Sequence, residues 1–444
     1  MTALKTTILS FQPSTNQWTL HVPVSVIKQL SKRETNIRLG TKHLGKQIAY
    51  SHTSPQIGSI STRVKVSLER GQLAMGPLIG ILTVKRGDGF KGNKKNFIDI
   101  IQTAKRIGAL VYVFNVEDIQ WSTETTGAYL YNDKEEAWNY VTKMPLPHVV
   151  YNRIPYREDE ERDYVQSALK QLKAMPTLHL YNSHFFNKWH LYEKLGKDAR
   201  VSQYIPDSVK LTTGKDLIFM MRKHPLLYLK PIDGKAGKGI MTVETEANRW
   251  VVKQKIGSKL VTKSFLSEAQ LWTHLRSKLQ SGYVIQQGIN LATYNDRLFD
   301  IRVLVQKDGT GTFKLSGVGI RVAGKNSITT HVPRGGSIAS PEIVLKEVAT
   351  EVGYQELLKR LKKTVLELAS ALESHYPGLG EMSMDIGLDK QGQLWFFEAN
   401  AKPMKFDEPH IRKTSLERII EYSQYLSKFV KKEDHSHASE ADHS

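Results

Sequence analysis

The chain has 444 residues, 40% hydrophobic and 24% charged, so it can form two or three folded domains and is neither disordered nor fibrous. It has no cysteine, which excludes disulfides, iron–sulfur clusters, thiolate zinc sites and a cysteine nucleophile. The formal charge of +19 attracts nucleotides, nucleic acids and acidic polymers without choosing among them. Without a signal-peptide pattern or a run of about 18 apolar residues, we expect a soluble, cytoplasmic protein with no membrane span.

Two different patterns fill the first 178 residues. Residues 1–75 contain short alternating runs rich in Thr, Ser and Val, which predict a small β-rich domain. Residues 76–178 begin with an apolar strand at 77–84, a helix at 94–107 and a second strand after Gly108. This strand–helix–strand order predicts a small α/β domain with a parallel sheet.

Residues 179–430 mix strands, glycine-rich loops and helices, including one long amphipathic helix expected from about 341 to 375. The final segment, 431–444, has no apolar periodicity and predicts a disordered tail. A solvated tail explains its histidines better than a metal site does; these are His435, His437 and His443.

A lysine followed by three glycines marks the end of an expected strand. Lys230 precedes Gly234, Gly237 and Gly239, and a second strand follows. Glycines let backbone N–H groups face an anion and lysines add charge, so this loop is a candidate phosphate cradle. It is not a Walker A loop, because Ile240 follows the last glycine and no helix follows. A solvated hairpin turn explains the pattern equally well.

Two strands near the C-terminus carry oxygen ligands on one face. Asp385 lies in the first strand, and Glu398 and Asn400 lie in the second. Carboxylate and amide oxygens suit Mg²⁺ or Mn²⁺. Ordinary solvent-facing acids are the alternative, but Glu398 follows aromatic residues that we expect to be buried, and a buried acid without a partner is costly.

The expected turn determines how these acids face each other. A turn centred on residues 390–391 would place Ser383 opposite Glu398 and Asp385 diagonal to it, roughly 7–8 Å away between Cα atoms. Acids at this distance could share one divalent cation.

Two further strands each carry an arginine, Arg302 and Arg321. A guanidinium that points off a central strand can hold a phosphoryl oxygen through two hydrogen bonds. A pair with the neighbouring Asp300 that supports the sheet is an equally good explanation. Upstream, an apolar strand ends in Gln286 and Gln287, whose amides could bind a nucleobase, although a polar strand end is the default explanation.

In this order, the motifs resemble the ATP-grasp superfamily. Glu398 follows Asp385 by thirteen positions and precedes Asn400 by two, as in the metal hairpin of D-alanine ligases. The stretches DIRVLV, GIRV and HVPRGGS are similar to those of the ribosomal-protein glutamate ligases. The chain resembles the YheC/YheD branch of endospore coat-associated proteins still more closely. The stretches that carry this resemblance are VVYNRIPYR, FFNKWHLYEKL, YLKPIDGKAGKGI, VIQQGINLA and FFEANAKP.

The resemblance implies an α+β ATP-grasp fold over residues 179–430, in which two subdomains clasp ATP. A small α/β parallel-sheet domain and an N-terminal β-rich domain precede it. It also implies roles for individual residues. Lys188 and Lys230 would contact the phosphates, and the loop that closes over them would contain Gly234, Gly237 and Gly239. The adenine and ribose contacts fall on Gln286, Gln287, Ile289 and Asn290. The ligands of Mg²⁺ or Mn²⁺ would be Asp385, Glu398 and Asn400, and the catalytic cations Arg302 and Arg321.

The implied activity is ATP-dependent ligation of an unknown carboxylate to an unknown amine through an acyl phosphate. The resemblance also implies a role in spore coat or cortex formation, with spore coat proteins as further partners. A catalytically inactive nucleotide-binding or structural coat component is the alternative. Phosphorylation of a hydroxyl group would use the same site. Nucleic acid is a poorer candidate partner, because the lysines are dispersed and no nucleic-acid-binding motif is present.

The sequence departs from these relatives at several positions. Lys235 and Lys238 of the glycine loop stand where serine or other small residues are often found. D-alanine ligases have an arginine where Ser383 stands, so Arg302 or Arg321 must supply that charge. The ribosomal-protein ligases have asparagine where His331 stands, which leaves the role of His331 open. Many relatives have aspartate in place of Asn187.

Overall fold

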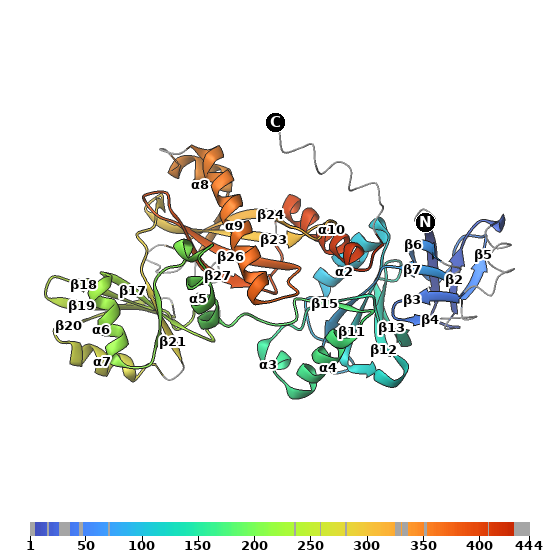
Figure 1. Cartoon of the computed structure of the whole chain (residues 1–444), viewed down its shortest axis with the longest axis horizontal. Helices are drawn as coiled ribbons and strands as arrows, with labels where there is room; N and C mark the ends of the chain where they lie inside the picture. The colour runs from blue at the N-terminus through green and yellow to red at the C-terminus, as the bar shows by residue number, and fades with distance from the viewer. Residues whose placement is uncertain are drawn as a thin grey trace.

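The structure is a computed structural model of an elongated chain in which four large sheets follow one another, as Figure 1 shows. It describes residues 5–15, 17–25, 36–43, 48–69, 72–234, 237–257, 259–279, 282–324, 330, 336–349, 353–406 and 408–429. The predicted tail at 431–444, with its three histidines, and His331 lie outside the described residues. Among the described helices, none combines the length and the apolar composition that a bilayer crossing requires.

The N-terminal sheet has the strand order β4-β3-β7-β6-β1-β2-β5. Leu9 and Phe11 of β1 are buried in its core. The strands are β1 (Lys5–Gln12), β2 (Gln17–His21), β3 (Asn36–Leu39), β4 (Lys42–His43), β5 (Ile48–Ser51), β6 (Ile60–Glu69) and β7 (Gln72–Gly76).

The second sheet, with the order β13-β12-β11-β8-β14-β15, contains the predicted strand–helix–strand unit. Strand β8 (Leu78–Thr83) and strand β11 (Leu110–Gln120) are parallel, and α2 (Lys94–Ile107) connects them. Gly108 ends the helix at a φ of 104°, a left-handed conformation that favours glycine. Antiparallel strands β12 and β13 extend one edge, which the prediction of a parallel sheet did not include.

The remaining elements around this sheet are short or lie on its surface. They are β9 (Lys85–Arg86), β10 (Gly89–Phe90), η2 (Trp121–Thr123), β12 (Thr125–Asn132), β13 (Ala137–Pro145), β14 (Val149–Asn152), α3 (Arg157–Glu160), α4 (Asp163–Ala174) and β15 (His179–Tyr181).

A third sheet, called the lid sheet here, has the order β16-β21-β17-β18-β19-β20. Leu217 and Leu271 of its two helices pack against Leu227 and Leu229 of β17. After α5 (Lys188–Gly196) and η3 (Ser202–Tyr204), the elements are β16 (Ser208–Leu211), α6 (Gly214–Lys223), β17 (Leu226–Pro231), β18 (Met241–Glu246), β19 (Arg249–Ile256), β20 (Lys259–Phe265), α7 (Glu268–Arg276) and β21 (Tyr283–Gln287).

The fourth sheet, called the floor sheet here, has the order β25-β24-β23-β26-β27, with β22 paired to β23. Ile301, Val303 and Val305 on one face of β23 share a core with α9, so the opposite face is left for the site. The elements are β22 (Thr293–Tyr294), β23 (Arg297–Lys307), β24 (Phe313–Val322), β25 (Ser337–Ala339), α8 (Pro341–Val348), α9 (Tyr354–His375), β26 (Glu381–Leu388) and β27 (Leu394–Asn400).

The prediction of one long helix from 341 to 375 is wrong. Two helices, α8 and α9, occupy this stretch. Gly353 precedes α9 at a φ of 79°, outside the helical region, so the chain turns there before the second helix begins. Apolar periodicity continues across the break and could not reveal it.

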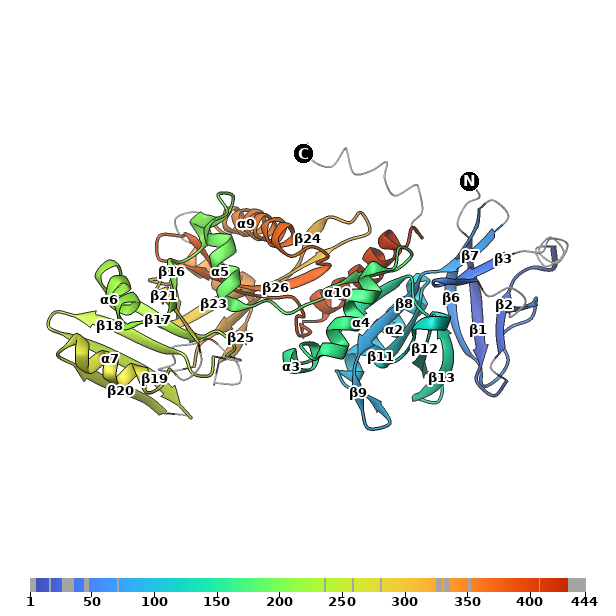
Figure 2. The same ribbon diagram turned by 60° about the horizontal axis from the view of Figure 1, so that its bottom comes forward.

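The C-terminal helix α10 (Pro409–Leu426) lies beside α2 and joins the second sheet to the floor sheet, as Figures 1 and 2 show. Ile419 and Ile420 pack with Ile100 of α2. Near the helix start, Ile411 packs on Leu304 of β23. The loop before α10 is therefore held beside the open face of the floor sheet.

Candidate functional site

A cavity of about 850 Å³ lies where the lid sheet faces the floor sheet. The chain lines it from three sides: the lid sheet, the floor sheet, and the segments next to the second sheet. Most of the predicted site residues line it, namely Lys188, Lys230, Gly234, Gly237, Gln286, Gln287, Ile289, Arg302, Arg321, Asp385, Glu398 and Asn400. Gly239 and Asn290 lie outside this lining; the Gly239 carbonyl accepts the Tyr283 hydroxyl, and the Asn290 carbonyl accepts the Lys390 N–H.

The predicted metal ligands lie on neighbouring strands of the floor. Asp385 on β26 pairs directly with Glu398 on β27, and Ser383 pairs with Asn400. The predicted register, with Ser383 opposite Glu398, is therefore wrong. The two carboxylates are direct cross-strand neighbours rather than diagonal ones, which brings them closer together than predicted.

Two local features cause this change of register. The turn is longer than predicted, since Leu388 pairs with Leu394 and Asp389 Oδ1 accepts the N–H groups of Gln391 (3.0 Å) and Gln393 (2.8 Å). The register then shifts by one residue between Asp385 and Ile386, at the position of Phe397. Glycine at 387 makes room for that residue, because a Cβ there would lie 2.4 Å from the Phe397 ring.

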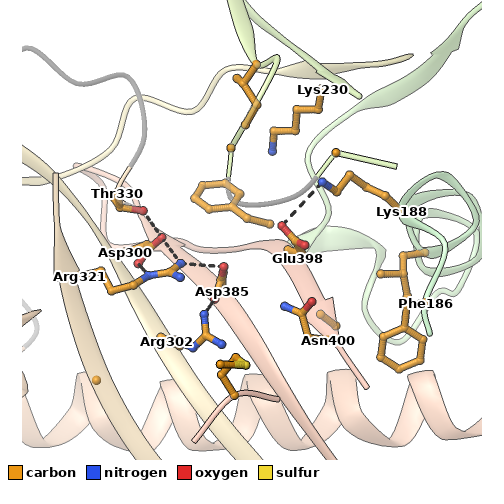
Figure 3. Close-up of a pocket in the computed structure, with 18 of the residues that line it drawn as sticks. Phe186, Lys188, Lys230, Asp300, Arg302, Arg321, Thr330, Asp385, Glu398 and Asn400 are labelled. Atoms are coloured by element: carbon orange, nitrogen blue, oxygen red, sulfur yellow. Dashed lines mark hydrogen bonds and ion pairs between the residues drawn. The ribbon is translucent and has the colours of Figure 1, made fainter. Parts of the chain in front are cut away.

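Arg321 on β24 organises the acids of the floor (Figure 3). Its Nε donates to Asp300 Oδ1 at 2.8 Å, and its Nη2 lies 2.6 Å from Asp300 Oδ2 and 2.7 Å from Asp385 Oδ2. The Thr330 hydroxyl also donates to Asp300. Burial lowers the pKa of Arg321, but the charges of Asp385 and Asp300 outweigh this effect and raise it above its usual value. Arg321 therefore stays charged and fixes Asp385.

Arg302 on β23 is held much more loosely. Its guanidinium lies 3.8 Å from Asp385 Oδ1 and 3.5 Å from the Ser383 hydroxyl, and its Cζ is 5.7 Å from the centre of the Phe406 ring. The small side chain of Ser383 lies beside the guanidinium. Arg302 thus brings a positive charge beside Asp385 and Ser383.

Two lysines face the floor acids from the other side of the cavity. Lys188, the first residue of α5, lies 3.8 Å from Glu398 Oε2, as Figure 3 shows. The preceding Asn187 caps this helix by accepting the His190 N–H at 3.1 Å. Lys230 on β17 donates to the side chain of Gln286. Burial, followed by the charge of Lys188, lowers the pKa of Lys230 to about 8.

The predicted hinge joins β21 to the floor sheet. The Gln286 side chain is used within the protein, since it accepts from Lys230 and donates to Ser208 Oγ at 3.0 Å. The Gln287 N–H donates to the Asp207 carbonyl at 2.8 Å. The Gln286 side chain thus positions Lys230, and the Gln287 N–H holds the hinge backbone against Asp207.

A model of the YheC/D-like ATP-grasp family matches residues 177–426. The chain is also 31% identical over 384 residues to the endospore coat-associated protein YheD of Bacillus subtilis, covering 82% of each chain. The chain belongs to the YheC/YheD-like ATP-grasp family.

A second relative of this family, the endospore coat-associated protein YheC of Bacillus subtilis, is 23% identical over 305 residues, covering 69% of this chain and 84% of the relative. Among solved structures, D-alanyl-alanine synthetase A of Vibrio cholerae is 13% identical with a TM-score of 0.46, covering 80% of this chain and 98% of that chain. An ATP-grasp ligase of Chryseobacterium gregarium, solved with ADP and a leader and core peptide, is 14% identical with a TM-score of 0.42, covering 80% and 97%.

The donor set of this YheC/YheD-like protein fits a hard divalent cation. Asp385 and Glu398 provide carboxylate oxygens from adjacent strands, and Asn400 provides an amide oxygen. Within the part of the chain that the structure describes, no three acid, histidine or cysteine side chains converge. Phosphate oxygens and water would therefore have to complete an octahedral shell around Mg²⁺.

The third wall of the cavity was not predicted from the sequence. Lys402, just after the metal hairpin, pairs with Glu160 of α3 and lies 4.3 Å from the Phe185 ring centre. Burial lowers the pKa of Lys402 to about 8, although the charge of Glu160 opposes this. Arg157 of α3 donates to the Phe186 carbonyl at 2.6 Å. The motifs EANAKP and NRIPYR contain two of these cations, but neither motif indicates that the two segments meet.

Proposed function

We propose that this ATP-grasp protein binds Mg-ATP in the cavity and activates a carboxylate as an acyl phosphate for ligation to an amine. One observation carries this proposal: Asp385 and Glu398 pair across β26 and β27 in the same cavity that Lys188 and Lys230 enter. A site for Mg-ATP needs both acids that bind the metal and lysines that bind the phosphates. The endospore-coat names of both relatives support a role in coat or cortex formation.

The site supplies positioning and charge rather than a protein nucleophile. Asp385, Glu398 and Asn400 would hold Mg²⁺, whose charge lowers the cost of bringing a carboxylate to the phosphates. Lys188 and Lys230 hold the phosphate chain. The substrate carboxylate attacks the γ-phosphorus, the bond from that phosphorus to the bridging oxygen breaks and ADP leaves, and the amine then displaces phosphate from the acyl phosphate.

The nucleotide's other contacts come from the hinge and the glycine loop. We propose that the backbone of residues 286–289 meets adenine and that Asn290 lies near the ribose. Gly234, Gly237 and Gly239 would place N–H groups along the phosphates. Positive φ values of 68° at Gly237 and 80° at Gly239 support this role, since side chains with a Cβ rarely adopt them.

The two arginines have different roles in this proposal. Arg321 has three close contacts to acids, so it positions Asp385. Among the described residues, Arg302 has only contacts of 3.5 Å or more to polar groups, so its donors can turn toward the transferred phosphoryl group. We assign the catalytic charge to Arg302.

Substitution of Glu398 tests the metal and nucleotide site. Isothermal titration calorimetry should show that Glu398→Gln binds Mg-ATP at least about tenfold more weakly than the parent protein, because one charged ligand is lost. Glu342→Gln, which changes an exposed acid on α8 that pairs with Lys346, is the matched control and should bind normally. Unchanged binding by Glu398→Gln would refute the metal assignment.

ADP release separates a ligase from a binding protein. The protein is incubated with Mg-ATP and a mixture of amino acids, short peptides and cell-wall fragments. ADP formation that requires the mixture supports the ligase. Mg-ATP binding without any ADP formation would instead indicate a catalytically inactive nucleotide-binding coat component.

A further inference from the structure

Glu408 is a cavity-lining acid with no role in the proposed nucleotide site. It immediately precedes α10 and caps the helix with its backbone, since its carbonyl accepts the Arg412 N–H at 2.8 Å. Its side chain does not cap the helix. Throughout the described ranges, its carboxylate makes no hydrogen bond or ion pair, although it is only partly exposed.

A hollow in the floor sheet lies directly beneath this carboxylate. Residue 319 on β24 is glycine, and a Cβ there would lie 3.3 Å from Glu408 Oε1 and 3.8 Å from Phe406 Cε1. The space between Glu408, Phe406 and the Gly319 backbone is therefore a shallow hollow, in which even a methyl group at 319 would crowd the carboxylate. This space opens into the cavity, because all three residues line it.

The hollow lies in one row with the metal ligands. Gly319 pairs with Arg302, Arg302 pairs with Asp385, and Asp385 pairs with Glu398, each on the next strand of the floor. Adjacent strands are about 5 Å apart, so Gly319 lies about 10 Å from Asp385 between Cα atoms. The row therefore begins with the two acids assigned to the metal and continues with Arg302, which is assigned to the phosphoryl group. It ends at the hollow over Gly319, beside Glu408.

From this order we propose that Glu408 and the hollow over Gly319 form the subsite for the amine substrate, which binds as a primary ammonium. This proposal rests on the proposed ligase function. An acyl phosphate held at Arg302 would present its carbonyl carbon toward Gly319, one strand further from the metal. A carboxylate on that side offers an ammonium a charge-assisted hydrogen bond, and the Phe406 ring offers it an apolar wall.

The same carboxylate can take the proton that must leave before attack. The ammonium gives one proton to Glu408, and the neutral nitrogen forms a bond to the acyl carbon. The bond between that carbon and the phosphate oxygen breaks. The second nitrogen proton leaves with phosphate as HPO₄²⁻, and Glu408 returns its proton to water. One N–H remains in the amide product.

Binding of a simple amine tests the subsite without knowledge of the natural substrates. Butylammonium chloride is titrated into the full chain with Mg²⁺ and a non-hydrolysable ATP analogue, and binding is followed by saturation-transfer NMR. Butanol is the uncharged probe of similar shape. Butylammonium should bind saturably and more tightly than butanol, and Glu408→Gln should weaken this binding about tenfold or more.

Matched variants separate the subsite from a general charge effect. Glu417→Gln removes the same charge from α10 at a surface residue that pairs with Arg106, and should leave butylammonium binding unchanged. Glu408→Asp should retain part of the binding. Butylammonium that fails to saturate the parent protein, or that binds Glu408→Gln and Glu417→Gln equally, would overturn the proposal.

Calorimetry with Mg-ATP distinguishes this failure from failure of the nucleotide site. Glu408→Gln should bind Mg-ATP like the parent protein, because Glu408 is placed on the far side of Arg302 from the metal acids. Loss of the amine subsite alone would leave nucleotide binding intact. A parent protein that does not bind Mg-ATP would instead refute the proposed function.

Discussion

The two sheets that face each other across the cavity hold their charges differently. On the floor, Arg321 contacts both Asp300 and Asp385 of neighbouring strands at 2.6–2.8 Å. On the lid, Lys230 is only partly exposed, yet its hydrogen-bond partner is the neutral amide of Gln286. Burial and the charge of Lys188 lower the pKa of Lys230, whereas Arg321 keeps a pKa above its usual value.

This contrast distinguishes a scaffold from a ligand-dependent surface. Opposite charges that are buried together compensate one another, so the floor can keep its geometry without a ligand. A buried cation without a carboxylate partner is costly until an anion arrives. We infer that the floor fixes the positions of the metal ligands and that the lid gains most from binding the phosphates.

The largest expected effect comes from breaking the ion pairs of the floor. Arg321→Met removes two hydrogen bonds from buried Asp300 and the close contact to Asp385. The free energy of unfolding should fall by about 3–5 kcal/mol, because buried carboxylates lose their counter-charge. Urea denaturation measures this loss.

The matched change on the lid is Lys230→Met, which removes a desolvated cation and leaves an amide behind. Its effect on the free energy of unfolding should be under about 1 kcal/mol, or stabilising. Equal losses for Arg321→Met and Lys230→Met would show that the two sheets do not differ in the way described.

Arg302 should affect transition-state binding rather than stability. Arg302→Met should weaken binding of Mg-ADP with aluminium fluoride, a mimic of the transferred phosphoryl group, by about 10²–10³-fold. Binding of Mg-ADP alone should change little, because Arg302 is assigned to the phosphoryl group that ADP lacks. Calorimetry with both ligands gives the comparison.

Arg302→Lys is the informative control for this site. It keeps the charge but loses the planar fork, so partial recovery of aluminium fluoride binding is expected. If Arg302→Met weakened both ligands equally, Arg302 would be a general phosphate contact and not the catalytic charge.

Alternation along the strands was enough to place the right residues on the site-facing side of the floor. A period of two predicts that Asp300 and Arg302 share a face, and that Glu398 and Asn400 do. It cannot say which residue faces which across two strands, because that depends on turn length and bulges. Phe397 is the extra residue at this bulge in β27, and it changes the cross-strand partner of Asp385. The alternation of side chains along the strand does not indicate this change.

Residues whose roles arise from contacts between distant segments could not be found from the sequence. Glu408 meets Gly319 only because α10 packs against both the second sheet and the floor sheet. The roles of Arg302 and Arg321 looked alike in sequence, since each lies in a strand. Only the direct pairing of Asp300 with Arg321 shows which of the two has its donors engaged.

The lid cation should make nucleotide binding depend on pH. Lys230, with a pKa of about 8, is protonated below that pH and neutral above it. Bound phosphates favour the protonated form, so the association constant for Mg-ATP should fall as the pH rises through 8. We expect roughly a tenfold decrease between pH 7 and pH 9. Lys230→Gln should bind more weakly at pH 7 and show a flatter profile, and an identical slope in both proteins would contradict the assignment.

A more modest effect than that of the floor ion pairs concerns the helix that presents Lys188. Asn187→Ala removes the cap of α5, whose side chain accepts the His190 N–H, and should cost about 0.5–2 kcal/mol in urea denaturation. Asn187→Asp retains a capping oxygen and should restore that stability. On the lid, Ser267→Ala removes the comparable cap of α7, whose side chain accepts the Gln270 N–H, and this helix contributes no residue to the lining of this cavity. Both alanine variants should lose similar stability, but only Asn187→Ala should also weaken Mg-ATP binding, because Lys188, to which we assign a phosphate contact, lies at the start of α5. Equal effects of the two variants on nucleotide affinity would mean that Lys188 acts through the stability of the whole chain and not through its position at the start of α5.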